Sequence, residues 1–241
     1  MTFTIAASEL KQITRNTSVL IGATAIPLGT SALLILGRDS YRDFPTGLGF
    51  AVGVMMVSIA ALGLYVTAVT TLAARRQTLF LKRLRSTAAS DTGILTGLLA
   101  PPVVISAIQV SIVLVVLAWI TEGPADPLLL ALSAVLLITL MLALALATVG
   151  VTRSPEHAQI TTLPITLGAI GLAMWIGLTG TDELPLVKAL LPTGATTQLS
   201  INAWNGGTPL DQNLLLLLPT LGWIAAALLM TKITFHWEPR H

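Results

Sequence analysis

Charged residues are absent from six long stretches of the sequence, and these stretches determine the architecture we expect. They cover residues 16–37, 44–74, 92–121, 127–152, 157–181 and 212–231. Each is long enough to cross the apolar core of a bilayer as a helix, which takes about 20 residues. The stretches are continuously apolar rather than alternating, which favours helices over the strands of a membrane barrel. We therefore predict spans near residues 18–37, 47–73, 95–120, 128–151, 158–180 and 212–232.

Three segments between or before the predicted spans carry further structure. In residues 3–16, the apolar side chains Phe3, Ile5, Ala6, Leu10 and Ile13 recur at helical spacing, which predicts an amphipathic helix on the membrane surface, with a frayed terminus as the alternative. The loop 74–93 holds five basic residues within eleven positions and continues the second span inward, and Ser90 and Asp91 cap the start of the third span. A polybasic loop of this kind also fits a plain role in topology or lipid contact.

The segment 182–211 is too polar to span the membrane and too apolar for a simple loop. Pro185 marks a helix start and Pro192 ends that helix, and a second short helix over 195–204 stops at the turn signal Asn205-Gly206-Gly207. Together these features predict an all-α membrane protein, with six transmembrane helices, an N-terminal amphipathic surface helix and a short re-entrant helical segment before the sixth span. Residues 1–241 form a single transmembrane domain in this interpretation.

Composition agrees with a membrane protein. Of the 241 residues, 54% are hydrophobic and 10% are charged, whereas soluble domains carry about 25% charged residues. The chain has no cysteine, which excludes disulfides, thiolate metal sites and cysteine nucleophiles. The net charge is +2, and membrane topology explains the basic residues better than a nucleic-acid partner does.

Basic residues divide unequally between the two sides that six spans create. One side, with both termini, carries Lys11, Arg15, Arg75, Arg76, Lys82, Arg83, Arg85, Arg153, Lys232 and Arg240, and the other carries Arg38, Arg42 and Lys188. Acidic residues lean to that second side. Because positively charged loops stay in the cytoplasm, we expect both termini to be cytoplasmic.

Catalytic chemistry has no candidate residues within the predicted spans. Apart from Lys232 at the last position of the sixth, no charged residue lies inside them, and the sequence has no metalloprotease, serine-hydrolase or P-loop motif. His157 lies at a span start, where a capping role is more plausible than catalysis. We therefore expect no catalytic, metal-binding or cofactor-binding residue, and any energy for transport comes from another polypeptide.

The arrangement resembles the permeases of type-2 ATP-binding cassette (ABC) exporters, the group that includes bacterial drug- and antibiotic-resistance exporters. The most specific part is the run RRQTLFLKRLRST at residues 75–87, where relatives show a basic pair followed by Leu-Lys-Arg-Leu-Arg-x-Thr-Pro. Ala88 stands where proline is usual, and the acidic residue that many relatives carry before this run is missing. Leu190-Leu191-Pro192-Thr193 is similar to the family's outer segment.

The resemblance implies an assembly of two permeases, identical or homologous, with two cytoplasmic ABC ATPase subunits that bind ATP and Mg²⁺, in a bacterial plasma membrane. Residues implied in coupling to the ATPase are Glu9, Lys11, Arg15, Arg75, Arg76, Lys82, Arg83, Arg85 and Asp91. The implied substrate path along the second and fifth spans offers Met55, Met56, Ser58, Thr67, Thr161, Thr162, Thr166, Met174 and Trp175, each of which also suits ordinary packing. Gly49 and Gly53 form a small-xxx-small pair, for contact between two copies or within one.

An uncharged path implies an amphiphilic or apolar substrate, such as a drug, antibiotic, lipid or peptide. Two other functions stay open from the sequence: a non-transporting membrane assembly or sensor protein, and an ion-coupled carrier. The absence of charged residues within the spans weakens the case for the carrier.

Overall fold

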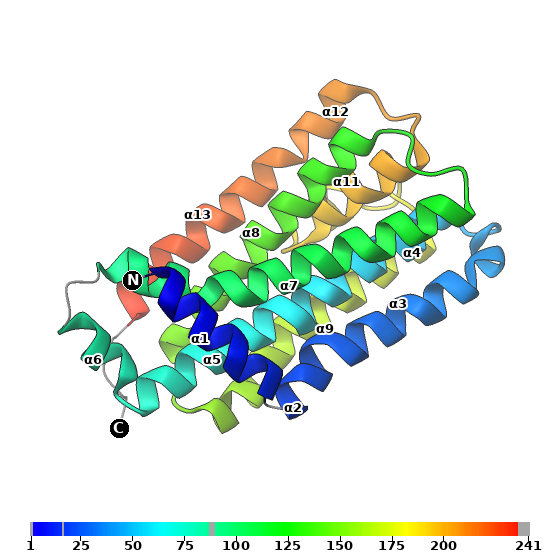
Figure 1. Cartoon of the computed structure of the whole chain (residues 1–241). Coiled ribbons are helices and arrows are strands. Elements are labelled where there is room, and N and C mark those ends of the chain that lie inside the picture. Colours follow the sequence, from blue (N-terminus) through cyan, green and yellow to red (C-terminus); the bar gives the residue numbers. More distant parts are fainter. Residues whose placement is uncertain (1, 16, 87–89, 236–241) are drawn as a thin grey trace.

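Helices account for every regular element of the described chain. The structure, a computed structural model, describes residues 2–15, 17–86 and 90–235. Successive long helices run in opposite directions, so their connections gather at two ends of an elongated bundle (Figure 1). We call one the basic end, which carries α1 (Thr2–Arg15), α6 (Phe80–Arg85) and the residues Arg75, Arg76, Arg83, Arg153 and Lys232. The acidic end carries Asp39, Asp43, Glu122, Asp126, Asp182, Glu183 and Asp211, together with Arg38, Arg42 and Lys188.

Five helices have the length and hydropathy of membrane spans: Leu48–Gln77, Asp91–Ile120 (α7), Pro127–Val151 (α8), Pro155–Thr179 (α9) and Leu210–Thr234. All five lie within about four residues of the predicted bounds, an ordinary uncertainty for sequence-based boundaries. The first predicted span is divided into α2 (Thr17–Leu20), the π-helical η1 (Ile21–Ala25) and α3 (Ile26–Leu36), and its apolar part, Ile21–Leu36, is shorter. The sixth crossing therefore stays a prediction.

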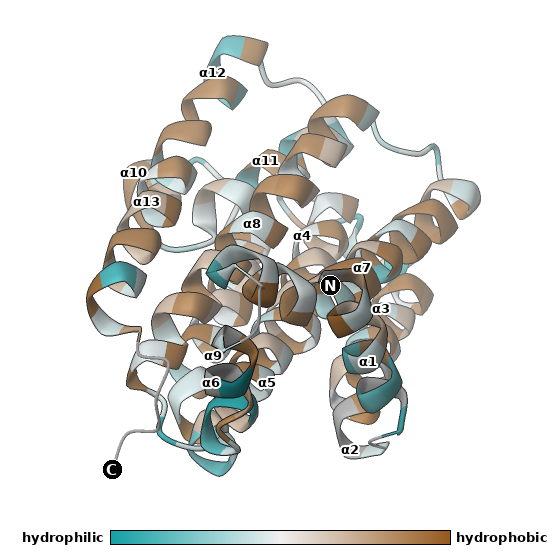
Figure 2. Cartoon of the chain, turned by 60° about the vertical axis from the view of Figure 1, so that its left-hand side comes forward, coloured by the Kyte–Doolittle hydropathy of each residue, from teal (hydrophilic) through white to brown (hydrophobic). Residues whose placement is uncertain are grey.

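Helix Leu48–Gln77, made of α4 (Leu48–Ser58), η3 (Ile59–Tyr65) and α5 (Val66–Gln77), lies at the centre of the bundle. In its most apolar window 89% of residues are buried, against 11% in Leu210–Thr234, which comprises α12 (Leu210–Leu215) and α13 (Leu217–Thr234). The surrounding helices expose large apolar side chains such as Val115, Leu132 and Leu229, and Figure 2 shows hydrophobic residues along α7, α8 and α13. This surface suits lipid.

The two π-helical segments, η1 and η3, face each other beside α7. A Cβ placed on Gly63 of η3 would lie 3.1 Å from the Ala23 carbonyl oxygen of η1 and 3.3 Å from Ser106 Oγ. Gln109 of α7 donates from Nε2 to that same carbonyl at 3.0 Å. Glycine thus allows a close crossing, and an amide side chain bonds a carbonyl of the irregular turn, as a bilayer interior demands.

The predicted re-entrant segment contains two short helices, α10 (Pro185–Leu190) and α11 (Gly194–Asn205). Pro185 begins α10 and Pro192 follows its end, as predicted. Residues 194–201 of α11 are all buried, and α11 lies inside the bundle at the acidic end (Figure 1). Backbone hydrogen bonds tie the end of α11 to the α7–α8 connection, from Ala125 N to Trp204 O at 3.0 Å and from Asp126 N to Ala203 O at 2.9 Å.

Gly49 and Gly53 pack against α11 of the same chain. A Cβ on Gly49 would lie 2.9 Å from Ile201 Cγ2, and one on Gly53 would lie 3.1 Å from Thr197 Cγ2. Of the two uses left open by the sequence, the structure shows the intramolecular one. The pair lets the central helix and α11 approach closely.

Helix α1 confirms the predicted N-terminal helix and lies across the bundle near the basic end (Figure 1). Its buried positions, Ile5 and Glu9, are one turn apart, whereas Phe3 is 85% and Leu10 is 44% exposed. The predicted apolar face is therefore split, because Ile5 contacts the protein while Phe3 and Leu10 point away from it. The side chain of Ile13 lies outside the described residues.

Replacing Gly49 by alanine tests the α4–α11 contact. We expect Gly49→Ala to lower the free energy of unfolding by about 1–3 kcal/mol, because the new methyl group overpacks against Ile201 and the Asn205 amide. Gly168→Ala is the matched control, since a Cβ there meets nothing within 4 Å. Thermal unfolding in detergent measures both, and equal melting temperatures for the two variants would contradict the contact.

Candidate functional site at the basic end

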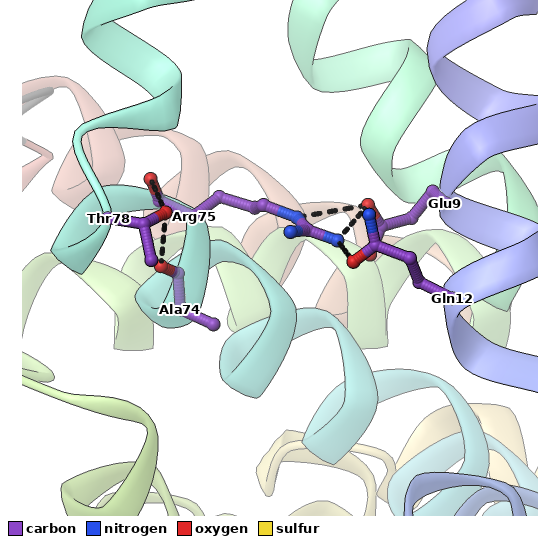
Figure 3. Close-up of polar contacts among 5 residues, drawn as sticks. All are labelled: Glu9, Gln12, Ala74, Arg75 and Thr78. Atoms are coloured by element: carbon purple, nitrogen blue, oxygen red, sulfur yellow. Dashed lines mark hydrogen bonds and ion pairs between the residues drawn. The ribbon is translucent and has the colours of Figure 1, made fainter. Parts of the chain in front are cut away.

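An ion pair joins the N-terminal helix to the central helix at the basic end. Arg75, near the end of α5, donates from Nη2 to Glu9 Oε2 at 2.8 Å and from Nε to the same oxygen at 3.1 Å. It also bonds the side-chain oxygen of Gln12, and Figure 3 shows its guanidinium reaching between Glu9 and Gln12. The centre of the Phe80 ring of α6 lies 5.3 Å from the Arg75 guanidinium carbon. One arginine therefore contacts α1 and α6 at once.

Glu9 is buried although it is not one of the apolar positions from which the amphipathic helix was predicted. Its side chain is 5% exposed and that of Arg75 is 17% exposed. Burial raises the pKa of Glu9 above 4.5, and the charge and hydrogen bonds of Arg75 only partly oppose this effect. The pair holds α1 through charge-assisted hydrogen bonds that are largely shielded from water.

Arg76, one of the residues implied in coupling, is enclosed by the bundle. Its side chain is fully buried, and it donates to the Val149 carbonyl at 3.1 Å and to the Thr152 carbonyl at the end of α8. A cation that bonds the last carbonyls of a helix also complements the negative end of the helix dipole. The structure gives Arg76 the role of joining α5 to α8.

The other predicted coupling residues are more dispersed. Lys11, Arg15, Arg83 and Asp91 are exposed, and Arg83 donates to the Thr78 carbonyl at 3.2 Å. Asp91 begins α7, whose N-cap is Ser90, as predicted. The side chains of Lys82 and Arg85 lie outside the described residues, although both belong to α6.

A hollow of about 580 Å³ lies where α5 turns into α6, lined by Thr78, Leu79, Arg83 and Ser86. The turn depends on Leu79, which adopts φ +56°, an uncommon conformation for a residue with a side chain. Leu79 is 46% exposed. An apolar side chain and a guanidinium thus line one recess on the polar end of the molecule.

The predicted substrate-path residues of the second span are enclosed. Met55, Met56, Ser58 and Thr67 are all buried inside the bundle. On α9, Thr162 and Thr166 are buried, whereas Trp175 is half-buried and Met174 is 42% exposed. Thr161 shares a hydrogen bond of 2.9 Å with Thr152. A path along the second span would require helices to separate.

Two polar features escaped the sequence interpretation. Lys188 of α10 is fully buried; its Nζ donates to Thr179 Oγ1 and to the Gly180 carbonyl, each at 2.8 Å, and lies 5.2 Å from the Trp175 ring centre. Within the described residues no carboxylate lies within ion-pair distance of it. Tyr65 bonds Thr148 across the core at 3.0 Å. The available sequence signal for the burial of Lys188 was that it is a lone lysine in an apolar segment.

His157 has the predicted capping role. Ser154 is the N-cap of α9 and accepts a hydrogen bond from the His157 backbone at 3.2 Å. In return, His157 Nδ1 accepts from the Arg153 backbone at 3.4 Å. The two bonds are similar to a capping box, except that the His157 side chain bonds the backbone of Arg153 rather than that of the N-cap Ser154. Among the described residues no group of three or more histidine, aspartate or glutamate side chains is placed to bind a metal ion.

Replacing Arg75 by glutamine tests the attachment of α1. Losing one partner of a buried pair leaves the other charge uncompensated, so we expect the free energy of local opening of α1 to fall by about 3 kcal/mol. Hydrogen exchange of the α1 amides measures this opening. Arg83→Gln removes an exposed cation from the same end and should leave α1 protection unchanged; a similar loss in both variants would contradict the attachment.

The pH dependence of stability tests the burial of Glu9. Because its pKa is raised above 4.5 in the folded state, its contribution to stability is fully present below that pH and is lost as the pH rises through the folded-state pKa. Relative to Glu9→Gln, the native chain should therefore lose stability as the pH rises from about 4.5 towards neutrality. Melting curves of both proteins across this range measure the difference, and a gain in stability with rising pH would contradict the burial of the carboxyl group.

Comparison with known proteins does not assign a family. The chain matches no protein-family model and no curated protein. The resemblance to exporter permeases therefore rests on the order of elements and on the basic run at residues 75–87. The structure itself shows a helical, multi-pass membrane protein with five candidate spans and a shorter apolar helix.

Proposed function

We propose that the chain is the membrane-spanning permease subunit of an ABC exporter. In this proposal it moves an amphiphilic or apolar substrate (a drug, antibiotic, lipid or peptide) out of the cytoplasm or the inner leaflet. ATP bound with Mg²⁺ on a separate ATPase subunit supplies the energy, because the sequence has no P-loop of its own.

The observation that carries the proposal is the contact of Arg75 with both Glu9 and Phe80. It joins the N-terminal helix α1 and the connection α6 into one polar surface at the end of the central helix. The family resemblance places the ATPase contact on these two elements. A displacement of α1 or α6 would be transmitted to the bundle interior, because Arg75 belongs to the central helix and Arg76 bonds the end of α8.

The proposed topology has six crossings in a bacterial plasma membrane. The helical stretch Thr17–Leu36 supplies the first crossing, because its 20 residues match the roughly 20 needed. The excess of lysine and arginine puts the basic end in the cytoplasm. Two permeases, identical or homologous, assemble with two cytoplasmic ATPase subunits.

Transport then requires two packings of the bundle that bind substrate differently. In the packing seen here Met55 and Met56 are closed off. ATP binding at the partner would favour a second packing in which the central helix moves away from α9 and a path opens. Methionine and threonine side chains on these helices suit a lipophilic substrate, because methionine adapts to varied apolar surfaces.

Co-purification with a P-loop ATPase encoded beside its gene tests the proposal. We expect Arg83→Glu to weaken ATPase association about tenfold. An ATPase surface that binds an arginine would be acidic, and the introduced glutamate would be repelled by it. Arg42→Glu, a reversal at the acidic end, is the control and should leave association and substrate-stimulated turnover in vesicles unchanged. Correct insertion of both variants is checked first.

Three results would contradict the proposal. No ATPase binds to the chain, an ATPase binds without any substrate-stimulated turnover, or substrate moves without ATPase in response to an ion gradient. The second result would indicate an assembly or sensor protein, and the third an ion-coupled carrier.

A further inference from the structure

Two hollows at the acidic end meet at a single residue, Trp204 of α11. The first is an apolar groove of about 400 Å³ between α7 and α8, whose walls include Leu114, Val115, Ala131 and Val135. The second is a polar pocket of about 450 Å³. Its lining includes four charged residues, Arg38, Asp39, Arg42 and Glu122. Trp204 lines both, so the apolar groove and the charged pocket are neighbours that share one lining residue.

The floor of this double hollow is held in place by the fold. Trp204 is 5% exposed, and its backbone carbonyl accepts the Ala125 hydrogen bond that ties α11 to the α7–α8 connection. The next residue, Asn205, also lines the polar pocket and donates from Nδ2 to the Thr46 carbonyl at 2.8 Å. The site is therefore formed before a ligand arrives, which lowers the entropy cost of binding.

Its position matches the boundary between lipid chains and head groups. Trp119, one residue before the pocket residue Ile120, is 86% exposed at the end of α7. Exposed tryptophan is enriched at the membrane–water interface. The groove follows two candidate membrane spans inward from this level, and the charged residues lie at or beyond it.

The charges of the pocket are of both signs. Arg42 and Asp39 form an exposed ion pair at 3.0 Å. Arg38 and Glu122 line the same pocket, yet neither forms an ion pair within the part of the chain that the structure describes. A guanidinium favours phosphate and a carboxylate favours ammonium, so the pair is complementary to a ligand that carries both groups.

We propose that the pocket and groove form a binding site for a phospholipid whose head group carries a phosphate and an ammonium. Arg38 binds the phosphate, Glu122 binds the ammonium, and one acyl chain lies along the groove between α7 and α8 against Trp204. This inference requires that these helices lie in a bilayer and does not rest on transport or on an ATPase partner.

Lipid retention by the purified chain tests the site. Native mass spectrometry is performed with phosphatidylethanolamine, with phosphatidylglycerol, which lacks the ammonium, and with diacylglycerol, which also lacks the phosphate. We expect phosphatidylethanolamine to bind at least about tenfold more tightly than either, since one charge-assisted hydrogen bond supplies such a ratio. Arg38→Gln should lose about this factor, whereas Arg153→Gln, a cation at the other end, should not.

Filling the groove is an independent test. Ala131→Phe and Ser111→Phe each place a ring in the groove at an exposed position, and both should reduce retention several-fold. Ala225→Phe, on the exposed face of α13, is the matched control. Melting temperatures near that of the native chain show that the variants fold.

Specific outcomes would overturn the proposal. Equal retention in site and control variants would mean that only general shell lipid binds. Equal retention of all three lipids would contradict binding of the head group in the pocket. Equal retention of phosphatidylethanolamine and phosphatidylglycerol would contradict binding of the ammonium by Glu122. A dimer that Ala131→Phe dissociates, with no bound lipid, would assign the groove to a second copy of the chain.

Discussion

The structure depends on how closely helices can pack when their surroundings are as apolar as their own surfaces. In a bilayer the hydrophobic effect does not press helices together, so van der Waals contact and satisfied polar groups must do so. The central helix Leu48–Gln77 meets this demand with small residues. Gly49 and Gly53 admit α11, and Gly63 admits the carbonyl of Ala23. The surrounding helices can then be apolar on their outer faces, where lipid completes the packing.

Buried polar groups lie at the ends of this packing and connect one helix to another. Arg76 bonds the terminal carbonyls of α8 at the basic end, and Lys188 bonds Thr179 and Gly180 at the end of α9, near the acidic end. Each cation meets the negative end of a helix dipole, where its charge is favoured. The Glu9–Arg75 pair adds α1 to the basic end. Any motion of α1 or α10 is therefore coupled to a long helix through a few hydrogen bonds.

Much of this fold could be predicted because charge and apolar length are local properties. The five long spans, the caps at Ser90 and His157, and the two short helices around Pro192 follow from local rules of solvation and helix termination. The burial of Glu9 and Arg76 could not be predicted, because it depends on partners 66 and 73 residues away. Lys188 bonds a carbonyl only 8 residues away, and its place in an apolar segment was a usable signal. Glu9 was not counted with the apolar positions of α1, although it lies one turn from Ile5, because the pairing with Arg75 that partly offsets its burial is visible only in the structure.

The candidate site was predictable in composition but not in arrangement. The sequence identified the basic run, yet only the structure separates the buried Arg76 from the exposed Arg83 and the paired Arg75. The two uses of Gly49 and Gly53 were equivalent in sequence, because a small-xxx-small pair does not name its partner. Distances to Ile201 and Thr197 decide between them. The π-helical segments η1 and η3 could not be predicted, because they lie within continuously apolar stretches whose spacing does not distinguish them from α-helix.

The central proposal is that the bundle crosses the membrane with its basic end in the cytoplasm, and labelling of single cysteines tests it most directly. The native chain has no cysteine, so Ser86→Cys and Glu183→Cys each introduce one reactive thiol, both at exposed positions on opposite ends. A membrane-impermeant thiol reagent on intact cells should label Glu183→Cys at once and Ser86→Cys only after the membrane is permeabilised. Labelling of Ser86→Cys in intact cells, or of both variants equally, would contradict the account.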